Sequence, residues 1–349
     1  MKTPGPFASL MLGLLLPVAA LSIEPHRDGQ QAFIARAVFV EGRLWLLTDA
    51  GELSSITEGS DKRVEETALA EPVHDICIHQ HTLFAFTCQR DGCTKGSLRT
   101  RDHGKWSIDA TLSLRKERVL ALMCDSPRIS LLTTRRLIDF DHADHRAVRL
   151  SEPLDVKPVA AVHDTPAGVF VGFNAGEWGG GLRRIDRRNG SVSTIESKGS
   201  GEICGGLLDA GCDPINGIVT EPWNSQCIAA AVGLVHMIAH GRIVEVCGTN
   251  VRRLYSRPME GPKTEAGEPW STVAFFGLST QGDALWAAGI DGLYEISADG
   301  TAKTRPMPDF KEIGGVYVNF DSPRMILVLT QINRRRSVSG AVPLLVPRL

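Results

Sequence analysis

The chain has 349 residues, which is long enough for one large domain or two ordinary ones. Its 43% hydrophobic and 22% charged residues are typical of a soluble globular protein, and its 35 glycines and 19 prolines indicate many turns. The 38 basic and 40 acidic side chains give a formal net charge of -2 and are scattered along the chain. This charge pattern excludes a basic footprint for nucleic acid, so we expect no nucleic-acid partner.

Residues 1–20 have the composition of a secretory signal peptide. Lys2 is followed by a nearly continuous apolar run, which matches a short charged region and a hydrophobic region. We expect cleavage after Ala20 and an exported protein, periplasmic or secreted, in which residues 21–349 form the mature domain. The alternative is an uncleaved membrane anchor, but a spanning helix needs roughly 20 apolar residues and Pro17 interrupts this shorter run.

The eight cysteines fit an oxidising compartment, where an even number usually forms disulfides. Two pairs are close in sequence, Cys88 with Cys93 and Cys204 with Cys212, and each would close a short loop. The other pairings stay open. Free thiols and a metal site are the alternatives, although no two of these cysteines have the CxxC spacing of zinc modules.

A repeated segment begins at Trp45, where an apolar strand is followed by a glycine six residues on and then by leucine or isoleucine. The same spacing recurs at Phe170, Cys227 and Trp286. Each copy predicts a β-hairpin, because two strand-like runs flank a turn that carries Gly or Asp. A further strand-like run precedes each hairpin, and a final strand often follows it, so each unit has about four strands.

The units start near residues 36, 73, 118, 159, 216, 273 and 314. This spacing overlaps the roughly 40 to 50 residues of a propeller blade. Long helical periodicity is not found after the signal region. The sequence therefore predicts an all-β fold, a single β-propeller of seven blades, with six blades as the alternative.

LWLLTDAGEL and LWAAGIDGLYEI, which begin at Leu44 and Leu285, resemble the degenerate repeat of the two-component-regulator, quinoprotein-like and YVTN-like propellers. In those families an apolar Leu-Trp pair precedes a glycine turn and a leucine. The resemblance extends over most of residues 33–347 and implies the fold. It does not imply a function, because such repeats occur in sensors, enzymes and assembly scaffolds alike.

The largest departure from the repeat is an insertion at residues 197–227, which is rich in glycine, acids and cysteines. Loops on a rigid scaffold often carry binding sites, so its polar and aromatic side chains are candidates for a ligand or metal rim. The alternative is a disulfide-pinned loop that packs over one blade. The candidate rim residues are Glu202, Asp209, Asp213, Glu221 and Trp223.

Two histidines on predicted innermost strands, His74 and His163, are followed by aspartates and would line the central channel. Either could act as a base or hold a cation there, or could be a hydrogen-bonded structural residue. Trp178 in a glycine-rich loop could stack on a flat or sugar-like ligand, or cover its own blade. The HMIAH segment from His236 to His240 lacks the glutamate of a zincin motif, so we predict no zinc site there.

The sequence contains no recognisable catalytic motif, and we expect a non-enzymatic, monomeric binding module for a protein, peptide or glycan, with no cofactor. One alternative is a lactonase-like, metal-assisted hydrolase with a cation in the central channel, for which Asn216 and Glu221 are partial ligand candidates. The other is a structural scaffold in envelope assembly, which would differ by having a permanent partner.

Overall fold

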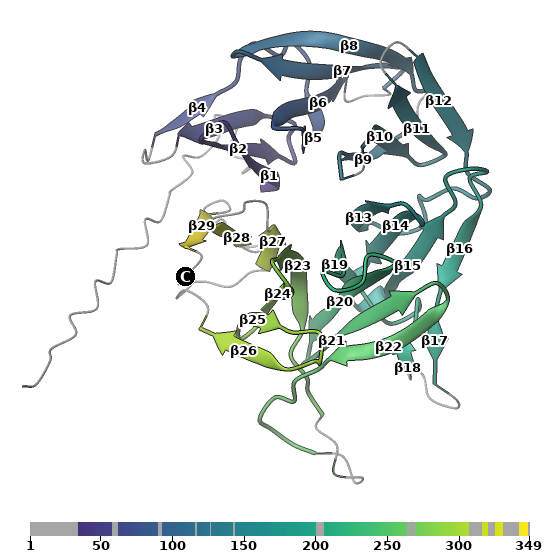
Figure 1. Cartoon of the computed structure of the whole chain (residues 1–349), viewed down its shortest axis with the longest axis vertical. Coiled ribbons are helices and arrows are strands. Elements are labelled where there is room, and N and C mark those ends of the chain that lie inside the picture. The colour runs from purple at the N-terminus through teal and green to yellow at the C-terminus, as the bar shows by residue number, and fades with distance from the viewer. Residues whose placement is uncertain are drawn as a thin grey trace, which may run out of the picture.

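The computed structural model is a β-propeller, in which the sheets surround a central axis with their first strands innermost (Figure 1). Apart from one 3-10 turn, η1 (Gly176–Trp178), the regular structure of the described residues is β-strand. Among these residues no helix is long and apolar enough to cross a membrane. The structure describes residues 34–57, 62–89, 93–115, 117–125, 127–141, 144–199, 206–263, 267, 270–306, 316–319, 325–330 and 342–347.

Six sheets have four antiparallel strands each, and each is continuous in sequence. The first three comprise β1 (Ile34–Val40), β2 (Arg43–Thr48), β3 (Leu53–Thr57) and β4 (Arg63–Glu65); β5 (Val73–His79), β6 (Thr82–Cys88), β7 (Lys95–Asp102) and β8 (Lys105–Ser113); and β9 (Val119–Met123), β10 (Ile129–Thr133), β11 (Arg136–Asp141) and β12 (Asp144–Arg149). The next three comprise β13 (Val159–Thr165), β14 (Gly168–Asn174), β15 (Gly180–Ile185) and β16 (Val192–Ile195); β19 (Ile215–Thr220), β20 (Cys227–His236), β21 (Ile238–Cys247) and β22 (Asn250–Tyr255); and β23 (Phe275–Gln281), β24 (Ala284–Gly289), β25 (Gly292–Ile296) and β26 (Ala302–Arg305).

Two smaller sheets complete the described structure. β17 (Ser197–Lys198) pairs with β18 (Gly206–Leu208) inside the predicted insertion. A three-stranded sheet of β27 (Val316–Asn319), β28 (Met325–Thr330) and β29 (Val342–Pro347) lies in the ring between β23–β26 and β1–β4 (Figure 1). The single propeller is confirmed, with six four-stranded blades, whereas the predicted signal peptide lies outside the described residues.

The predicted unit starts lie within two residues of the first strand of each sheet. All six first strands of the four-stranded blades also share a feature that the repeat did not indicate, a β-bulge directly after their first paired residue. A bulge adds one residue and bends the strand. The extra residues are Ala35, His74, Leu120, Ala160, Asn216 and Phe276.

The core lies between neighbouring sheets. Buried side chains form five apolar clusters, and each joins strands of two adjacent sheets. Trp45, which begins the first repeat, is 1% exposed and meets Trp106 edge to face at a ring distance of 6.4 Å. A four-stranded sheet has apolar residues on both faces and cannot bury either face alone, so the ring is the smallest unit that excludes water.

The third repeat copy predicts a turn at Gly233, and this prediction is wrong. β20 continues through Gly233 to His236, and the chain reverses at Met237. Gly233 is instead required by packing, because a Cβ there would lie 2.1 Å from the carbonyl oxygen of Phe275. Gly241 pairs with Gly233 inside the sheet, and a Cβ there would lie 2.4 Å from the carbonyl oxygen of Val273.

Buried polar side chains connect the innermost strands of adjacent sheets. Asp75 on β5 accepts hydrogen bonds from the backbone N–H of Ile76 at 2.8 Å and from that of Leu122, on β9, at 2.6 Å. The disulfide between Cys77 and Cys124 joins the same two sheets. These links hold the innermost strands of the second and third blades in position relative to each other.

Replacing Asp75 by alanine is expected to lower the free energy of unfolding by about 1–3 kcal/mol, because two buried N–H groups lose their acceptor. Urea unfolding measures this loss. Asp283, on the turn between β23 and β24, is exposed, and its replacement by alanine is the matched control. Equal stability of the two variants would show that the Asp75 link does not contribute.

Candidate functional site

The connections between strands divide between the two faces of the ring. Because each sheet has four antiparallel strands, the fourth strand ends on the face where the first strand began. The linkers between sheets and the turns between second and third strands therefore share one face, which we call the linker face. The first-to-second and third-to-fourth turns lie on the opposite face.

Exposed apolar side chains are concentrated on the linker face. The described residues include eight exposed large hydrophobic side chains, and only Val64 and Ile108 lie elsewhere, on the outermost strands β4 and β8. The other six belong to linkers, or to the turns between second and third strands and the strand ends beside them, which marks this face as the candidate site. They are Val156, Trp178, Val235, Met237, Ile238 and Trp270.

Four of these side chains belong to two adjoining segments, η1 and the β20–β21 hairpin, and we call them the apolar patch: Trp178, Val235, Met237 and Ile238. Trp178 ends η1 and is 76% exposed, and Met237, at the tip of the β20–β21 hairpin, is 95% exposed. An ion pair of 2.9 Å between Glu177 and His236 joins the two loops. The sequence singled out Trp178 but not the hairpin tip, because the turn was expected at another residue.

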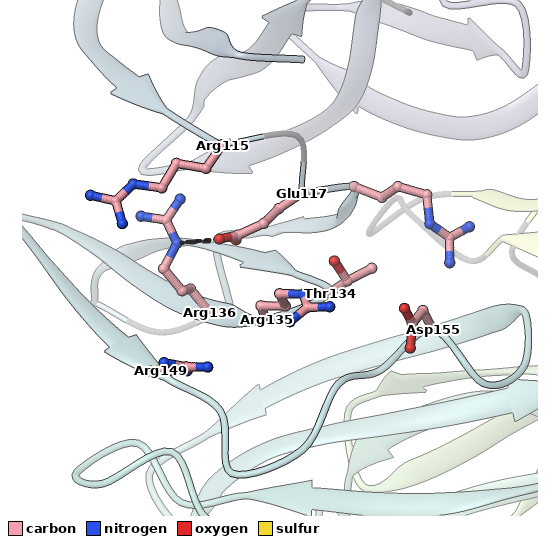
Figure 2. Close-up of a pocket in the computed structure, with 8 residues that line it drawn as sticks. Arg115, Glu117, Thr134, Arg135, Arg136, Arg149 and Asp155 are labelled. Carbon is pink, nitrogen blue, oxygen red and sulfur yellow. Dashed lines mark hydrogen bonds and ion pairs between the residues drawn. The ribbon is translucent and has the colours of Figure 1, made fainter. Parts of the chain in front are cut away.

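A second feature of the linker face is a pocket of about 570 Å³ beside the third blade (Figure 2). It lies where the linker before β9, the β10–β11 turn and the end of β12 come together. The sequence did not indicate it, since its charged residues are dispersed over four sequence segments. The lining residues are Arg115, Glu117, Arg118, Thr134, Arg135, Arg136, Arg149 and Asp155.

The acids of the predicted insertion hold its backbone in place. Asp213 is fully buried, forms an ion pair with Arg242, and accepts a hydrogen bond of 2.7 Å from the backbone N–H of Asp209. His240 lies 3.2 Å from the Asp213 carboxylate, and burial together with the Arg242 guanidinium lowers the pKa of its imidazole. Asp213 is therefore not on the solvent-facing rim, and Glu202 lies outside the described residues.

The two channel histidines make contacts within the scaffold. The ring of His74 lies 3.2 Å from the carbonyl oxygen of Cys88. His163 contacts the hydroxyl of Thr220, in the next sheet, at 2.8 Å and the carboxylate of Asp125, in the preceding one, at 3.5 Å. These contacts favour the structural interpretation of both residues, with His163 as a link between three sheets.

Asn216 and Glu221 do not converge on one cation. Five residues separate them along β19 and its end, which corresponds to about 16 Å of extended strand. The Asn216 amide donates to the carbonyl oxygens of Gly233 and Phe275 at 2.8 Å each, and its oxygen accepts from Asn174 at 2.6 Å. Asn216 is thus engaged in holding three sheets together.

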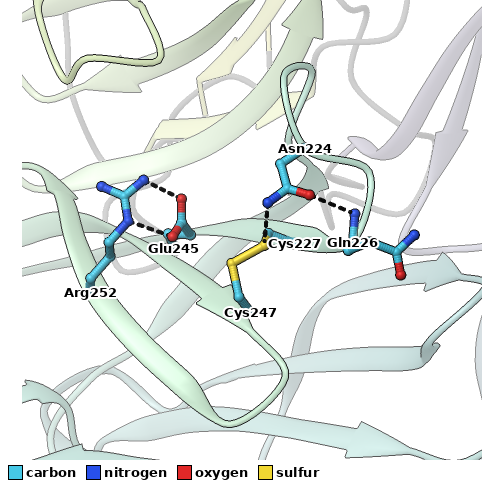
Figure 3. Close-up of a disulfide and its surroundings, with 6 residues drawn as sticks. All are labelled: Asn224, Gln226, Cys227, Glu245, Cys247 and Arg252. Atoms are coloured by element: carbon cyan, nitrogen blue, oxygen red, sulfur yellow. Dashed lines mark hydrogen bonds and ion pairs between the residues drawn. A yellow bond between two sulfur atoms is a disulfide. The ribbon is translucent and has the colours of Figure 1, made fainter.

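Glu221 is 2% exposed, and its carboxyl oxygens make no hydrogen bond of standard geometry in the described structure. Burial and the neighbouring carboxylate of Glu245 raise its pKa to about 8. Glu245 is itself paired with Arg252 (Figure 3). Glu221 is therefore not on a solvent-facing rim, and Trp223 is half-buried against the apolar cluster between the fifth and sixth blades.

The disulfide prediction is confirmed for Cys88 and Cys93. Cys212 is also disulfide-bonded, while its predicted partner Cys204 lies outside the described residues. A further bridge joins Cys227 and Cys247, which face each other across β20 and β21 (Figure 3). The spacing of Cys227 and Cys247 in the sequence did not predict this pairing, because it depends on the register between β20 and β21.

One group of metal-ligand types occurs among the described residues: Cys227, Glu245 and Cys247. Both sulfur atoms belong to the disulfide, and the carboxylate is paired with Arg252. A metal needs deprotonated thiolates, so this group does not fit one.

No protein-family model matches the sequence, and no curated protein matches it either. Among solved structures, the chain is similar to YCF48 bound to D1 peptide, with 13% identity and a TM-score of 0.58 over 96% of both chains. YCF48 from Cyanidioschyzon merolae is similar at 11% identity and a TM-score of 0.55, over 94% of this chain and 98% of that one.

The extracellular domain of the putative one component system BT4673 from B. thetaiotaomicron is similar at 13% identity, with a TM-score of 0.54. The match covers 93% of this chain but 39% of that one, so the chain spans about two fifths of the length of that extracellular domain. At such identities the likeness shows the propeller fold alone.

The buried Glu221 carboxyl predicts a pH-dependent stability. Its folded pKa of about 8 exceeds the ordinary value of 4.5, so the folded state binds a proton more tightly than the unfolded state. Stability from this group is therefore present at low pH and is lost as the pH rises towards 8. The glutamine side chain in the Glu221→Gln variant cannot ionise. The unfolding free energy of the variant minus that of the parent should therefore rise by about 1–3 kcal/mol between acidic and mildly basic pH.

Urea unfolding of both proteins across this pH range measures the effect. Exposed Glu152 on the linker before β13 supplies the control substitution, Glu152→Gln. Parallel pH profiles for the parent and Glu221→Gln would contradict a proton held at Glu221.

Proposed function

We propose that this propeller is a binding module whose linker face docks a protein or peptide segment. The observation that carries the proposal is the concentration of six exposed hydrophobic side chains on that face. A soluble protein seldom gathers large apolar side chains in one exposed place without a partner to cover them. Trp and Met are also enriched in protein interfaces.

The chemistry around the exposed apolar side chains favours a protein over a lipid surface or a glycan. Acidic side chains accompany the exposed apolar ones, with Glu177 beside Trp178 and Glu260 in the linker that carries Trp270. An anionic membrane repels such charges. The aliphatic members of the apolar patch offer no hydrogen bonds to sugar hydroxyls, whereas they fit the side chains of a peptide.

Two further points support the proposal. YCF48, a propeller of similar extent, has been solved bound to D1 peptide, and the loops of a rigid sheet scaffold are suitable places for binding. A permanent scaffold role in envelope assembly would use the same face and would differ only in the lifetime of the complex.

We also propose that the protein is exported, is monomeric, and has the β27–β29 sheet as its seventh blade. Disulfides within and between blades support an oxidising compartment, and the signal-like composition of residues 1–20 agrees with it. Membership of the two-component-regulator, quinoprotein-like or YVTN-like repeat class is part of the same proposal. A lactonase-like hydrolase gains no support from Asn216 and Glu221, which serve the scaffold.

Selection from a random peptide library on the immobilised mature protein tests the docking proposal. Peptides enriched on the parent should bind at least about tenfold more weakly to the double variant Trp178→Ala/Met237→Ala, because truncating the centre of an interface costs more than about 1 kcal/mol per residue. Fluorescence anisotropy with the enriched peptides gives the dissociation constants.

The control is Val64→Ala/Ile108→Ala, which removes two exposed apolar side chains from the outermost strands. Its affinity should match that of the parent. A library without enriched peptides, or an equal affinity of the patch variant and the parent, would contradict the proposal.

A further inference from the structure

The pocket beside the third blade is lined mostly by arginine. Five of its eight lining residues are arginines and two are carboxylates, which gives an excess of three positive charges. Guanidinium groups gathered around a pocket repel one another and create a local positive potential, although the whole chain has a net charge of -2. The pocket therefore attracts an anion.

One of the five arginines is fixed in place. The Nε of Arg136 donates to both carboxylate oxygens of Glu117, at 2.9 and 3.0 Å, and its Nη2 donates to the carbonyl oxygen of Ser113 at 2.8 Å. Thr133 donates its hydroxyl to Glu117 at 2.6 Å. This network holds the Arg136 guanidinium in the pocket wall, where it neutralises the carboxylate of Glu117 (Figure 2).

The other four arginines extend from three segments around the pocket, and their side chains are exposed. Within the described residues they have no ion pair and no side-chain hydrogen bond. Their planar donors are free for bidentate contacts with carboxylate or phosphate oxygens. They are Arg115, Arg118, Arg135 and Arg149.

The lining also limits which anion fits. Thr134 is the one uncharged residue among the eight, and none is aromatic or aliphatic. A nucleotide or sugar ligand would require a surface on which a ring stacks, and a lipid tail would require an apolar wall. A volume of about 570 Å³ accommodates several small anionic groups, such as a run of acidic side chains.

We propose that this arginine pocket recognises the carboxylates of an acidic segment, and that this segment belongs to the protein or peptide that docks on the linker face. The inference rests on the proposed function and adds its specificity: the apolar patch binds hydrophobic side chains, and the pocket binds aspartates, glutamates or a chain terminus. Both features lie on one face, because each is made from linkers and second-to-third-strand turns.

Fluorescein-labelled hexaglutamate is the direct probe, with hexaglutamine as its uncharged counterpart. Hexaglutamate should bind at least about tenfold more tightly, because charge-assisted hydrogen bonds from guanidinium to carboxylate are stronger than the neutral ones that glutamine can accept. Its affinity should fall as sodium chloride rises from about 50 to about 200 mM, since the contacts are exposed ion pairs.

The variant Arg118→Glu/Arg135→Glu should reduce hexaglutamate binding by at least about tenfold, because it replaces two attractions by two repulsions. Arg146→Glu/Arg253→Glu makes the same change in net charge on the outermost strands β12 and β22 and should bind like the parent. If the first variant does not fold, Arg118→Gln/Arg135→Gln tests the same contacts without repulsion.

Equal binding of hexaglutamate and hexaglutamine, or equal losses in the two charge-reversal variants, would overturn the inference. Displacement of hexaglutamate by inorganic phosphate, but not by chloride at equal ionic strength, would also overturn it, because the pocket would then select phosphate. If library peptides bind through the apolar patch without any preference for acids, the docking proposal stands and the acidic specificity fails. If no peptide binds at all, both fail.

Discussion

Close packing of the innermost strands against their neighbours is the constraint on which the rest of this structure depends. At Gly172 a Cβ would lie 2.6 Å from the Ile215 side chain, and at Gly217 it would lie 2.6 Å from the backbone nitrogen of Leu278. Gly233 meets Phe275, at the start of β23, in the same way, and Gly241 meets Val273 and Ala274 in the linker just before it. Such contacts allow no side chain, so the glycines let neighbouring backbones approach and the five apolar clusters close between sheets. The β-bulges at the start of the first strands supply the bend that this approach requires.

A scaffold closed by its own sheets leaves its linkers free to vary. This explains why the two features with binding chemistry, the apolar patch and the arginine pocket, lie on the linker face and between blades. The patch is formed by two loops of adjacent sheets joined by the ion pair between Glu177 and His236. The pocket is formed by segments before, within and after the third sheet. Neither is continuous in sequence, and the rigid ring holds both in position.

Several residues that suggested chemistry in the sequence serve the scaffold instead. Asp213 and Arg242 pair in the interior and anchor the insertion, and Asn216 connects three sheets through its amide. A buried charge or amide is costly unless it is paired, so each such group marks a place where the backbone must be held. Glu221 differs from them, because within the described part of the chain it forms no ion pair and it lies beside Glu245, and burial together with that neighbour raises its pKa to about 8.

The sequence by itself determined the all-β propeller, the positions at which the units begin, and the Cys88–Cys93 bridge, because hydrophobic alternation, glycine turns and short spacings are local signals. The tertiary structure alone decided which acids are buried, which cysteines face each other across strands, and that the hairpin after β20 turns at Met237. It also brought Arg115, Arg118, Arg135 and Arg149 together, although 34 residues separate the first from the last. These contacts cannot be predicted from the spacing of residues along the chain, because they depend on strand register and on the side-by-side packing of sheets around the ring.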